Sequence, residues 1–120
     1  NDVADVITSE AVDIASGIGT RFIVGLTKSG FSARMISRHK VWQDIVAMTP
    51  DKNTFARLIL SYGITPVLIR NFKTLNEAMV IIRSHFIKNK LVKRGDRVVV
   101  VAGMPFGKKG ATNMILAQKI

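Results

Sequence analysis

The sequence predicts an α/β domain of three layers, in which helices cover both faces of a five-stranded, mostly parallel sheet. Segments with the apolar period of an amphipathic helix alternate with short, continuous apolar runs, which are typical of strands buried on both faces. This alternation requires right-handed crossovers between parallel strands. The loop before the last apolar segment is too short to hold a crossover helix, so we expect the fifth strand to be antiparallel.

Two helices and two strands are predicted in the first part of the chain. Apolar residues at helical spacing predict a helix over Asp2–Ser16, which two glycines end. The apolar run RFIVGLT predicts a strand over Arg21–Thr27. A helix over Ser32–His39 and a strand over Asp44–Thr49 follow.

Capping residues predict where the next two helices begin. Thr49 and Pro50 are suited to the N-cap and the first position of a third helix, which we expect to run to about Ser61. A T-x-x-E capping box at Thr74 predicts the start of a fourth helix, which reaches about Asn89.

Three further apolar runs complete the predicted sheet. Thr65–Ile69 is the third strand, and Pro66 places it at an edge of the sheet because proline has no N–H to donate to a neighbour. The run DRVVVVAG predicts a fourth strand over Asp96–Gly103. The final apolar segment is Asn113–Ile120.

The composition excludes several kinds of protein. The 120 residues suit a single domain, and the absence of Cys excludes disulfide frameworks, thiolate metal sites, iron–sulfur clusters and cysteine nucleophiles. No apolar run approaches the ~18 residues that a membrane helix needs, so we expect no membrane partner. Since the chain begins with Asn1 rather than Met, we expect it to be one domain of a longer protein.

The net charge of +10 points to an anionic partner. Half of the 8 acidic residues lie within the first 13 positions. The rest of the chain therefore has 18 basic side chains against 4 acidic ones. The densest basic stretch, from Lys88 to Arg97, has Phe86 as its only nearby aromatic residue, whereas a nucleic-acid surface needs rings interleaved with the charges. A solvated helix end and turn explains this stretch better, and a basic nucleic-acid-binding module stays an alternative.

Three loops follow predicted strands at the edge where open α/β sheets bind their ligands: Thr27–Ser32, Thr49–Asn53 and Gly103–Thr112. In the first, a strand enters a helix through three hydroxyl side chains, a Gly and Lys28, which together with backbone N–H groups supply the donors of a phosphate cradle. An ordinary N-cap and turn explains the same residues equally well. The G-x-x-x-x-G-K-[ST] pattern is absent, so nothing indicates nucleotide hydrolysis.

The candidate site residues come from the first and third of these loops. Helix capping explains Thr49–Asn53. The third loop has flexible glycines and two adjacent lysines that are suited to folding across an anion, although a loose hairpin connection is the alternative. The candidate phosphate-binding residues are Thr27, Lys28, Ser29, Gly30, Phe31 and Ser32. The candidate residues of the covering loop are Gly103, Gly107, Lys108, Lys109, Gly110 and Thr112.

The usual catalytic constellations are missing from the sequence. His39 lies at a basic helix end, and His85 has no acidic residue three or four positions away, so neither indicates a metal site or a catalytic base. Trp42 is predicted to be a packing or interface residue. These 120 residues by themselves do not indicate an enzyme.

The segments in this order resemble the C-terminal domain of pyruvate kinase along essentially the whole chain. The most specific pieces are TKSGFSAR, at Thr27–Arg34, and GDRVVVVAGMPFGKKGATN, at Gly95–Asn113. The resemblance implies a five-stranded mixed sheet whose last strand is antiparallel. It also implies a domain without the catalytic site, which lies in a barrel that residues 1–120 do not include.

The function is what the resemblance implies rather than what the spacing shows. Such domains bind a phosphorylated effector, commonly a sugar phosphate or AMP, and contribute subunit contacts in a homotetramer. The parent enzyme would be a cytoplasmic, glycolytic phosphotransferase that moves phosphoryl from phosphoenolpyruvate to ADP. No cofactor is expected in this domain, and Mg and K ions are expected only in the catalytic part.

The resemblance also assigns roles to the candidate loops. Thr27–Ser32 matches the effector-phosphate loop, and Gly103–Thr112 matches the segment that closes over the effector. The segment Arg70–Lys73 lacks the Trp with which related domains hold a second phosphate, so a monophosphate effector, or none, fits as well as a bisphosphate. A free-standing domain of the same fold, acting as a phosphate-ligand sensor or a phosphohydrolase, is the other alternative.

Overall fold

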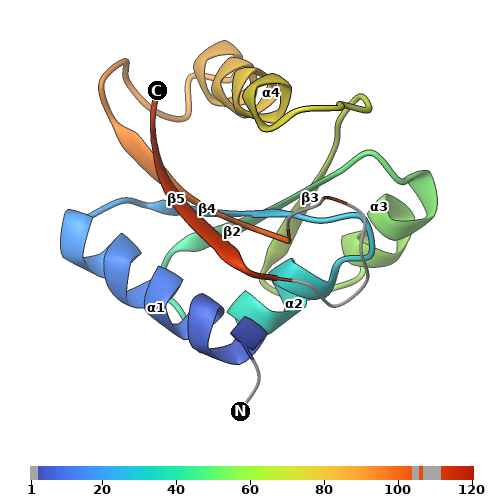
Figure 1. The fold of residues 1–120 in the computed structure, drawn as a ribbon, viewed down its shortest axis with the longest axis horizontal. Helices are drawn as coiled ribbons and strands as arrows, with labels where there is room; N and C mark the ends of the chain where they lie inside the picture. The colour runs from blue at the N-terminus through green and yellow to red at the C-terminus, as the bar shows by residue number, and fades with distance from the viewer. Residues whose placement is uncertain (1–2, 104–105, 107–111) are drawn as a thin grey trace.

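A computed structural model describes residues 3–103, 106 and 112–120 as a twisted sheet between two helical layers (Figure 1). The sheet and helices alternate along the chain as the sequence predicts. In chain order the elements are α1 (Val3–Ile18), β1 (Phe22–Leu26), α2 (Phe31–Ser37), β2 (Asp44–Thr49), α3 (Lys52–Ile59), β3 (Ile64–Leu68), α4 (Leu75–Lys88), β4 (Arg97–Ala102) and β5 (Met114–Lys119).

The five strands lie in the order β3-β2-β1-β4-β5. The first four strands of this order are parallel, and β5 pairs antiparallel with β4 in a register that sets Ala102 opposite Met114. The predicted fold class and the antiparallel last strand are therefore confirmed. Pro66 lies in β3 at an edge of the sheet, as its missing N–H requires.

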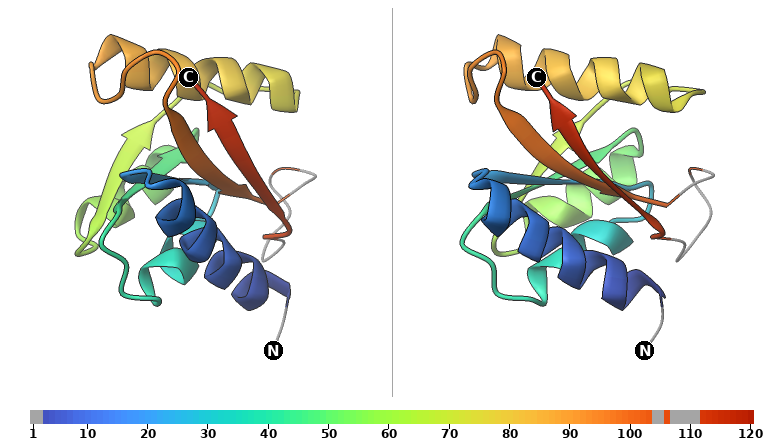
Figure 2. Two further views of the ribbon diagram at one scale, coloured as in Figure 1. Left: turned by 90° about the vertical axis from the view of Figure 1, so that its left-hand side faces the viewer. Right: turned by 60° about the vertical axis from the view of Figure 1, so that its left-hand side comes forward.

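The two faces of the sheet are covered unequally. One face carries α4 alone, and the other carries α1, α2 and α3 (Figure 2). On the first face, Phe86 of α4 packs edge-on against Phe22 of β1, with ring centroids 5.0 Å apart. On the second face, the helices approach closely through small residues, among them Ala11, Ala15 and Ala33. Nearly every strand residue of β1, β2 and β4 is buried, which explains their continuous apolar runs.

A glycine sets the distance between β1 and α2. A Cβ atom added to Gly25 would lie 3.1 Å from the Cα and the backbone N of Ala33, which is tighter than ordinary packing. The atoms that this Cβ would meet belong to the backbone of α2, so no flexible side chain is available to move aside. Gly25 thus lets the helix that follows the first candidate loop sit directly on the central strand.

The predicted N-cap of the third helix is wrong. Thr49 belongs to β2, where its carbonyl accepts from the N–H of Ile69 at 2.9 Å. The N-cap is Asp51, whose Oδ1 accepts from the N–H of Thr54 at 2.9 Å. Thr and Asp are both good N-cap residues. Thr49 is paired in the sheet, so Asp51 caps the helix. The capping prediction for Thr74 is confirmed, since its Oγ1 accepts from the N–H of Glu77 at 3.2 Å.

The helix ends differ from the predicted ends by one or two residues. The helix α1 continues to Ile18 instead of ending at Ser16, whereas α2 ends at Ser37 and α3 at Ile59, each two residues early. Short helices lose their last turn because the terminal carbonyls have no helical partners. Within the described residues, no helix has both the length and the apolar character that crossing a bilayer requires.

Candidate functional site

The first and third candidate loops leave neighbouring strands at the same edge of the sheet. In the parallel pairing of β1 with β4, Leu26 lies beside Ala102, so the chain leaves both strands side by side at Thr27 and Gly103. The N–H of Thr27 still donates to the carbonyl of Met48 in β2, at 3.0 Å. This edge joins the carboxyl ends of the three central strands, where open α/β sheets bind ligands.

The segment Thr27–Ser32, called the hydroxyl loop below, is held by its own side chains. The Oγ1 of Thr27 accepts from the N–H of Gly30 at 2.8 Å, and the Oγ of Ser29 accepts from the N–H of Phe31 at 3.3 Å. The first N–H to join the helical ladder of α2 is that of Arg34, which donates to the carbonyl of Gly30. Of the first-turn N–H groups that precede that bond, the N–H of Phe31 already donates to Ser29, whereas those of Ser32 and Ala33 have no partner within the helix and can donate to an anion.

Gly30 is the N-cap of α2 and has a positive φ of 89°. L-residues adopt this left-handed region only at a cost, and a Cβ at Gly30 would also lie 2.6 Å from Nη1 of Arg34. The turn from β1 into α2 therefore depends on this glycine.

The structure brings the hydroxyl loop into contact with the segment that leads into β5. The hydroxyl groups of Ser32 and Thr112 lie 2.7 Å apart and share a hydrogen bond, and both side chains are buried. Among the predicted residues of the covering loop, Gly103 and Thr112 are described, whereas Gly107, Lys108, Lys109 and Gly110 lie outside the described residues. Both described ends of the covering loop are thus adjacent to the hydroxyl loop.

The sequence analysis missed the support that α3 gives to the hydroxyl loop. The buried hydroxyl of Thr54 donates to the carbonyl of Lys28 at 2.7 Å. Arg57, one turn further along α3, donates from Nη2 to Oγ1 of Thr54 at 3.1 Å. No local pattern gives this contact, because it depends on α3 lying beside the β1–α2 turn.

Two guanidinium groups also converge on the middle of the hydroxyl loop. Arg34 donates from Nη1 to the carbonyl of Ser29 at 3.2 Å, and Arg57 donates from Nη2 to the same carbonyl at 3.4 Å. Lys28 is exposed beside them. Three positively charged side chains therefore lie at this loop, whereas the sequence by itself predicted only Lys28 there.

One carboxylate shares this environment. The N–H of Thr54 holds the pKa of Asp51 below its usual value, against an opposing effect of desolvation. The N–H of Asn53 and the positive charges of Arg57 and Lys28 lower the pKa of Asp51 further. Asp51 is consequently ionised near neutral pH, and the local charge of Lys28, Arg34 and Arg57 exceeds it.

The histidines have structural contacts. His39 lies 3.0 Å from Oγ1 of Thr8 through its Nε2 and joins the end of α2 to α1. His85 packs against the ring of Phe86 and receives a long, 3.3 Å contact from Nδ2 of Asn89. Burial lowers the pKa of His85. In the part of the chain that the structure describes, no three His, Asp or Glu side chains are grouped closely enough to hold a metal ion.

Comparison with known proteins identifies one family. The family model described as "Pyruvate kinase, alpha/beta domain" matches residues 5–116. A pyruvate kinase of Lactobacillus delbrueckii subsp. bulgaricus is 34% identical over 120 residues, which are 100% of this chain and 20% of the relative. A pyruvate kinase of Methylorubrum extorquens is 30% identical over 112 residues, which are 93% of this chain and 23% of the relative.

The same fold is present in a solved structure. The crystal structure of a pyruvate kinase from Cryptosporidium parvum matches 99% of this chain, and 23% of its own, with a TM-score of 0.86 at 20% identity. At that identity the likeness shows the fold. The chain spans about a fifth to a quarter of the length of the relatives that it matches.

Proposed function

Because this chain belongs to the pyruvate kinase family and is its C-terminal α/β domain, we propose that it binds a phosphorylated effector at the hydroxyl loop and contributes subunit contacts. The catalytic reaction, phosphoryl transfer from phosphoenolpyruvate to ADP, belongs in this proposal to the part of the protein outside residues 1–120. The Mg and K ions of that reaction belong there as well.

The buried hydrogen bond between Ser32 and Thr112 is the observation that carries the effector proposal. It holds the end of the covering loop against the first turn of α2, where N–H groups have no partner within the helix. A phosphate that binds those N–H groups lies beside Ser32 and competes for its hydroxyl. Binding therefore acts directly on the anchor of the covering loop.

The chemistry of the hydroxyl loop suits a phosphate monoester. Backbone N–H groups and serine hydroxyls donate to phosphate oxygens, and Lys28 supplies a cation. The segment before α4 has Phe72, which packs against Phe106 of the covering loop with ring centroids 4.6 Å apart. This apolar contact involves the segment in which, by the resemblance, related domains hold a second phosphate. We therefore propose a monophosphate, either a sugar phosphate or AMP.

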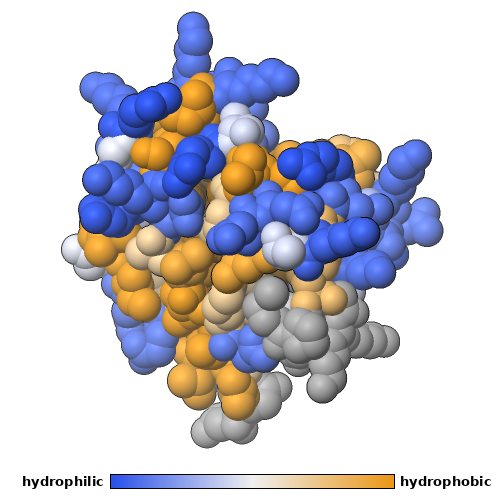
Figure 3. All heavy atoms as spheres, turned by 45° about the horizontal axis from the view of Figure 1, so that its top comes forward, coloured by the Kyte–Doolittle hydropathy of each residue, from blue (hydrophilic) through white to orange (hydrophobic). Residues whose placement is uncertain are grey.

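Subunit contacts are proposed at the opposite end of the sheet from β3. Figure 3 shows an apolar band that runs over β5 and reaches the N-terminal end of α1. On α1, apolar side chains that the sequence assigned to one helical stripe are partly exposed, among them Val3 (63%) and Val6 (54%). β5 is also an edge strand with unpaired backbone groups. An exposed apolar band beside an open strand favours a second copy of the domain.

Calorimetric titration tests the effector proposal. Glucose 6-phosphate, AMP and inorganic phosphate are titrated into the protein and into two variants, Ser29→Asp and Ser84→Asp. We expect heat with at least one phosphate ester. Ser29→Asp should abolish it because a carboxylate then occupies the loop, whereas Ser84→Asp, at an exposed position on α4, should leave it unchanged. Absence of heat with all three ligands, or full binding by Ser29→Asp, rejects the proposal.

A further inference from the structure

Positive charge that the proposed function does not use gathers where α4 ends and β4 begins. Exposed cationic side chains lie on the C-terminal half of α4, on its connection to β4, and on the paired strand ends of β4 and β5. This surface, called the basic corner below, is defined by Arg83, Lys88, Lys90, Lys93, Arg94, Arg97 and Lys119. Figure 3 shows long hydrophilic side chains that project at its upper left, where α4 ends. The basic corner lies at the opposite edge of the sheet from the hydroxyl loop, because β4 begins beside the start of β1.

The basic corner has little negative charge to balance it. Between residues 83 and 97, Asp96 is the only acidic residue. Its Oδ2 accepts from the backbone N–H of Lys93 at 2.9 Å. No cationic group of the basic corner is in an ion pair with another described residue. These like charges repel one another, and a bound polyanion would relieve the repulsion.

Part of the basic corner is concave. A hollow of about 360 Å³ is lined by the cationic Arg83, Arg94 and Lys119, together with Ile87 and Ile120. Arg83 donates from Nη2 to the carbonyl of Lys119 at 3.2 Å, which fixes the position of its guanidinium at the hollow. Arginine binds phosphate through two parallel N–H bonds, and both arginines have N–H groups to give. The hollow is therefore suited to one phosphate group, whose neighbours in a chain would meet the surrounding lysines.

The end of α4 has a lysine at a position that favours glycine. Lys90 has a positive φ of 54°, in a turn where the N–H of Leu91 donates back to the carbonyl of Phe86 at 3.0 Å. Helices commonly end in this way with glycine, because an L-residue in the left-handed region is strained. The charge at this position therefore comes at a cost in stability.

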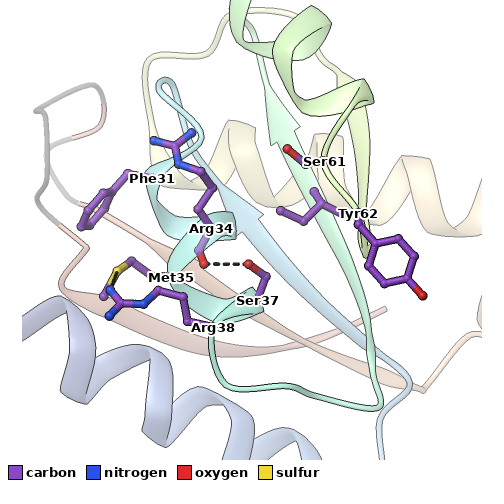
Figure 4. A pocket seen from close by; sticks show the side chains of 8 residues that line it. Phe31, Arg34, Met35, Ser37, Arg38, Ser61 and Tyr62 are labelled. Carbon is purple, nitrogen blue, oxygen red and sulfur yellow. Dashed lines mark hydrogen bonds between the residues drawn. The ribbon is translucent and has the colours of Figure 1, made fainter.

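The other pocket lined by arginines lacks this convergence of charge. It has a volume of about 550 Å³ and lies between α2 and Tyr62. Figure 4 shows the guanidinium groups of Arg34 and Arg38 well apart. The first donates to the carbonyl of Ser29 and the second to Sδ of Met35. These two groups do not meet at one phosphate.

We propose that the basic corner binds linear inorganic polyphosphate, a flexible chain with negative charge on every phosphate. Recognition of this chain needs cations and N–H donors, and the basic corner supplies both. Single-stranded nucleic acid fits less well, because Phe86, the nearby aromatic residue, is fully buried and offers no ring for a base. A flat membrane or a rigid duplex would contact one side of a corner, whereas a flexible chain can follow the helix end, the connection and the strand ends. This site goes beyond the proposed function and does not depend on the effector.

Fluorescence anisotropy with a labelled short-chain polyphosphate, measured on the full-length protein, tests the proposal. We expect an affinity that falls steeply with added salt, because binding releases counterions. Lys90→Gly should weaken binding about fivefold, as expected for one cation at an anionic surface. Its thermal stability should be unchanged or higher, because glycine removes the strain.

The matched control is Lys40→Gly. Lys40 follows α2, away from the basic corner, and has nearly the same backbone conformation, with φ 52°. The same substitution therefore removes the same charge and the same strain, and it should leave the affinity for polyphosphate unchanged. Arg94→Gln tests the hollow independently of the helix end and should also weaken binding about fivefold. Its control is Arg38→Gln on α2, which should not.

Other outcomes overturn the proposal. These are no binding at low salt, or equal losses of affinity in the variants of the basic corner and in their controls. Tighter binding of duplex DNA, or of phosphatidylserine vesicles, at equal phosphate concentration assigns the surface to that partner instead. Ser29→Asp separates the two proposals, since it should abolish effector heat and leave the affinity for polyphosphate in place. Loss of polyphosphate binding in Ser29→Asp would place the chain at the hydroxyl loop and reject the basic corner.

Discussion

Ser32 and Thr112 are 80 residues apart in the sequence, and their hydroxyl groups share a 2.7 Å hydrogen bond in the interior. This bond joins the first turn of α2 to the segment that leads into β5, a strand at an edge of the sheet. Each hydroxyl can donate or accept, and burial makes the pair costly to break on one side only. The stability of the domain and the position of the covering loop therefore depend on the same contact.

Replacing Thr112 by Val should destabilise the protein. Val keeps the shape of Thr and leaves the hydroxyl of Ser32 buried without this partner, which should lower the free energy of unfolding by about 1–3 kcal/mol. Urea unfolding measures the change. Thr65→Val, at an exposed position of β3, should change it by less than about 0.5 kcal/mol. If Thr112→Val is as stable as this control, the bond does not contribute.

Replacing Gly25 by Ala should be harmful, whereas the same change at Gly17 should not. The new Cβ at Gly25 meets the backbone of Ala33 at 3.1 Å, and overpacking of this kind costs about 1–3 kcal/mol. At Gly17, inside α1, nothing lies within 4 Å of the added Cβ, and alanine should stabilise the helix by about 0.5–1 kcal/mol. Thermal unfolding of both variants measures the opposite signs.

The Asp51 cap should make stability depend on acid pH. Its pKa is lower in the folded protein than the ordinary value of 3.8, so the unfolded chain binds the proton more tightly. The stabilisation is present above 3.8 and is lost as the pH falls through the folded pKa. Asp51→Asn keeps a capping oxygen without this titration. Its urea midpoint should therefore decline less steeply with acid than that of the unchanged protein, and equal slopes would contradict the assignment.

His85 should titrate below its ordinary pKa of 6.5 because burial disfavours the charged ring. The unfolded state then binds the proton more tightly than the folded state. The contribution of His85 to the free energy of unfolding is therefore fully present above pH 6.5 and is lost as the pH falls from there through the folded pKa. NMR titration of the His85 ring protons measures the folded pKa directly. A midpoint at or above 6.5 would show that burial does not control this ring.

The exposed side chain of Val6 should matter for self-association. Val6→Glu places a charge in the apolar band over α1 and β5, and it should shift the full-length protein toward smaller species in sedimentation velocity. Val80→Glu, at a similarly exposed position on α4, serves as the control and should leave the distribution unchanged. If the two variants sediment alike, the band is not a subunit contact.

Local patterns in the sequence determined the class of the fold. The alternating apolar periods predicted the order of helices and strands, the missing N–H of Pro66 predicted an edge strand, and the short last connection predicted that β5 would be antiparallel. Each of these depends on residues close together in the chain or on the length between two elements. The hydroxyl loop could be found in the same way, because its residues are consecutive.

The tertiary structure alone decided which residues meet around that loop. The bonds of Ser32 to Thr112 and of Thr54 to Lys28, and the convergence of Arg57 on Ser29, exist because strand order and helix packing bring distant segments together. The choice of Asp51 over Thr49 as N-cap was made by sheet pairing, which competes with the local capping preference. An apolar period shows that a face is apolar, whereas only packing shows whether anything covers it, as exposed Val6 demonstrates.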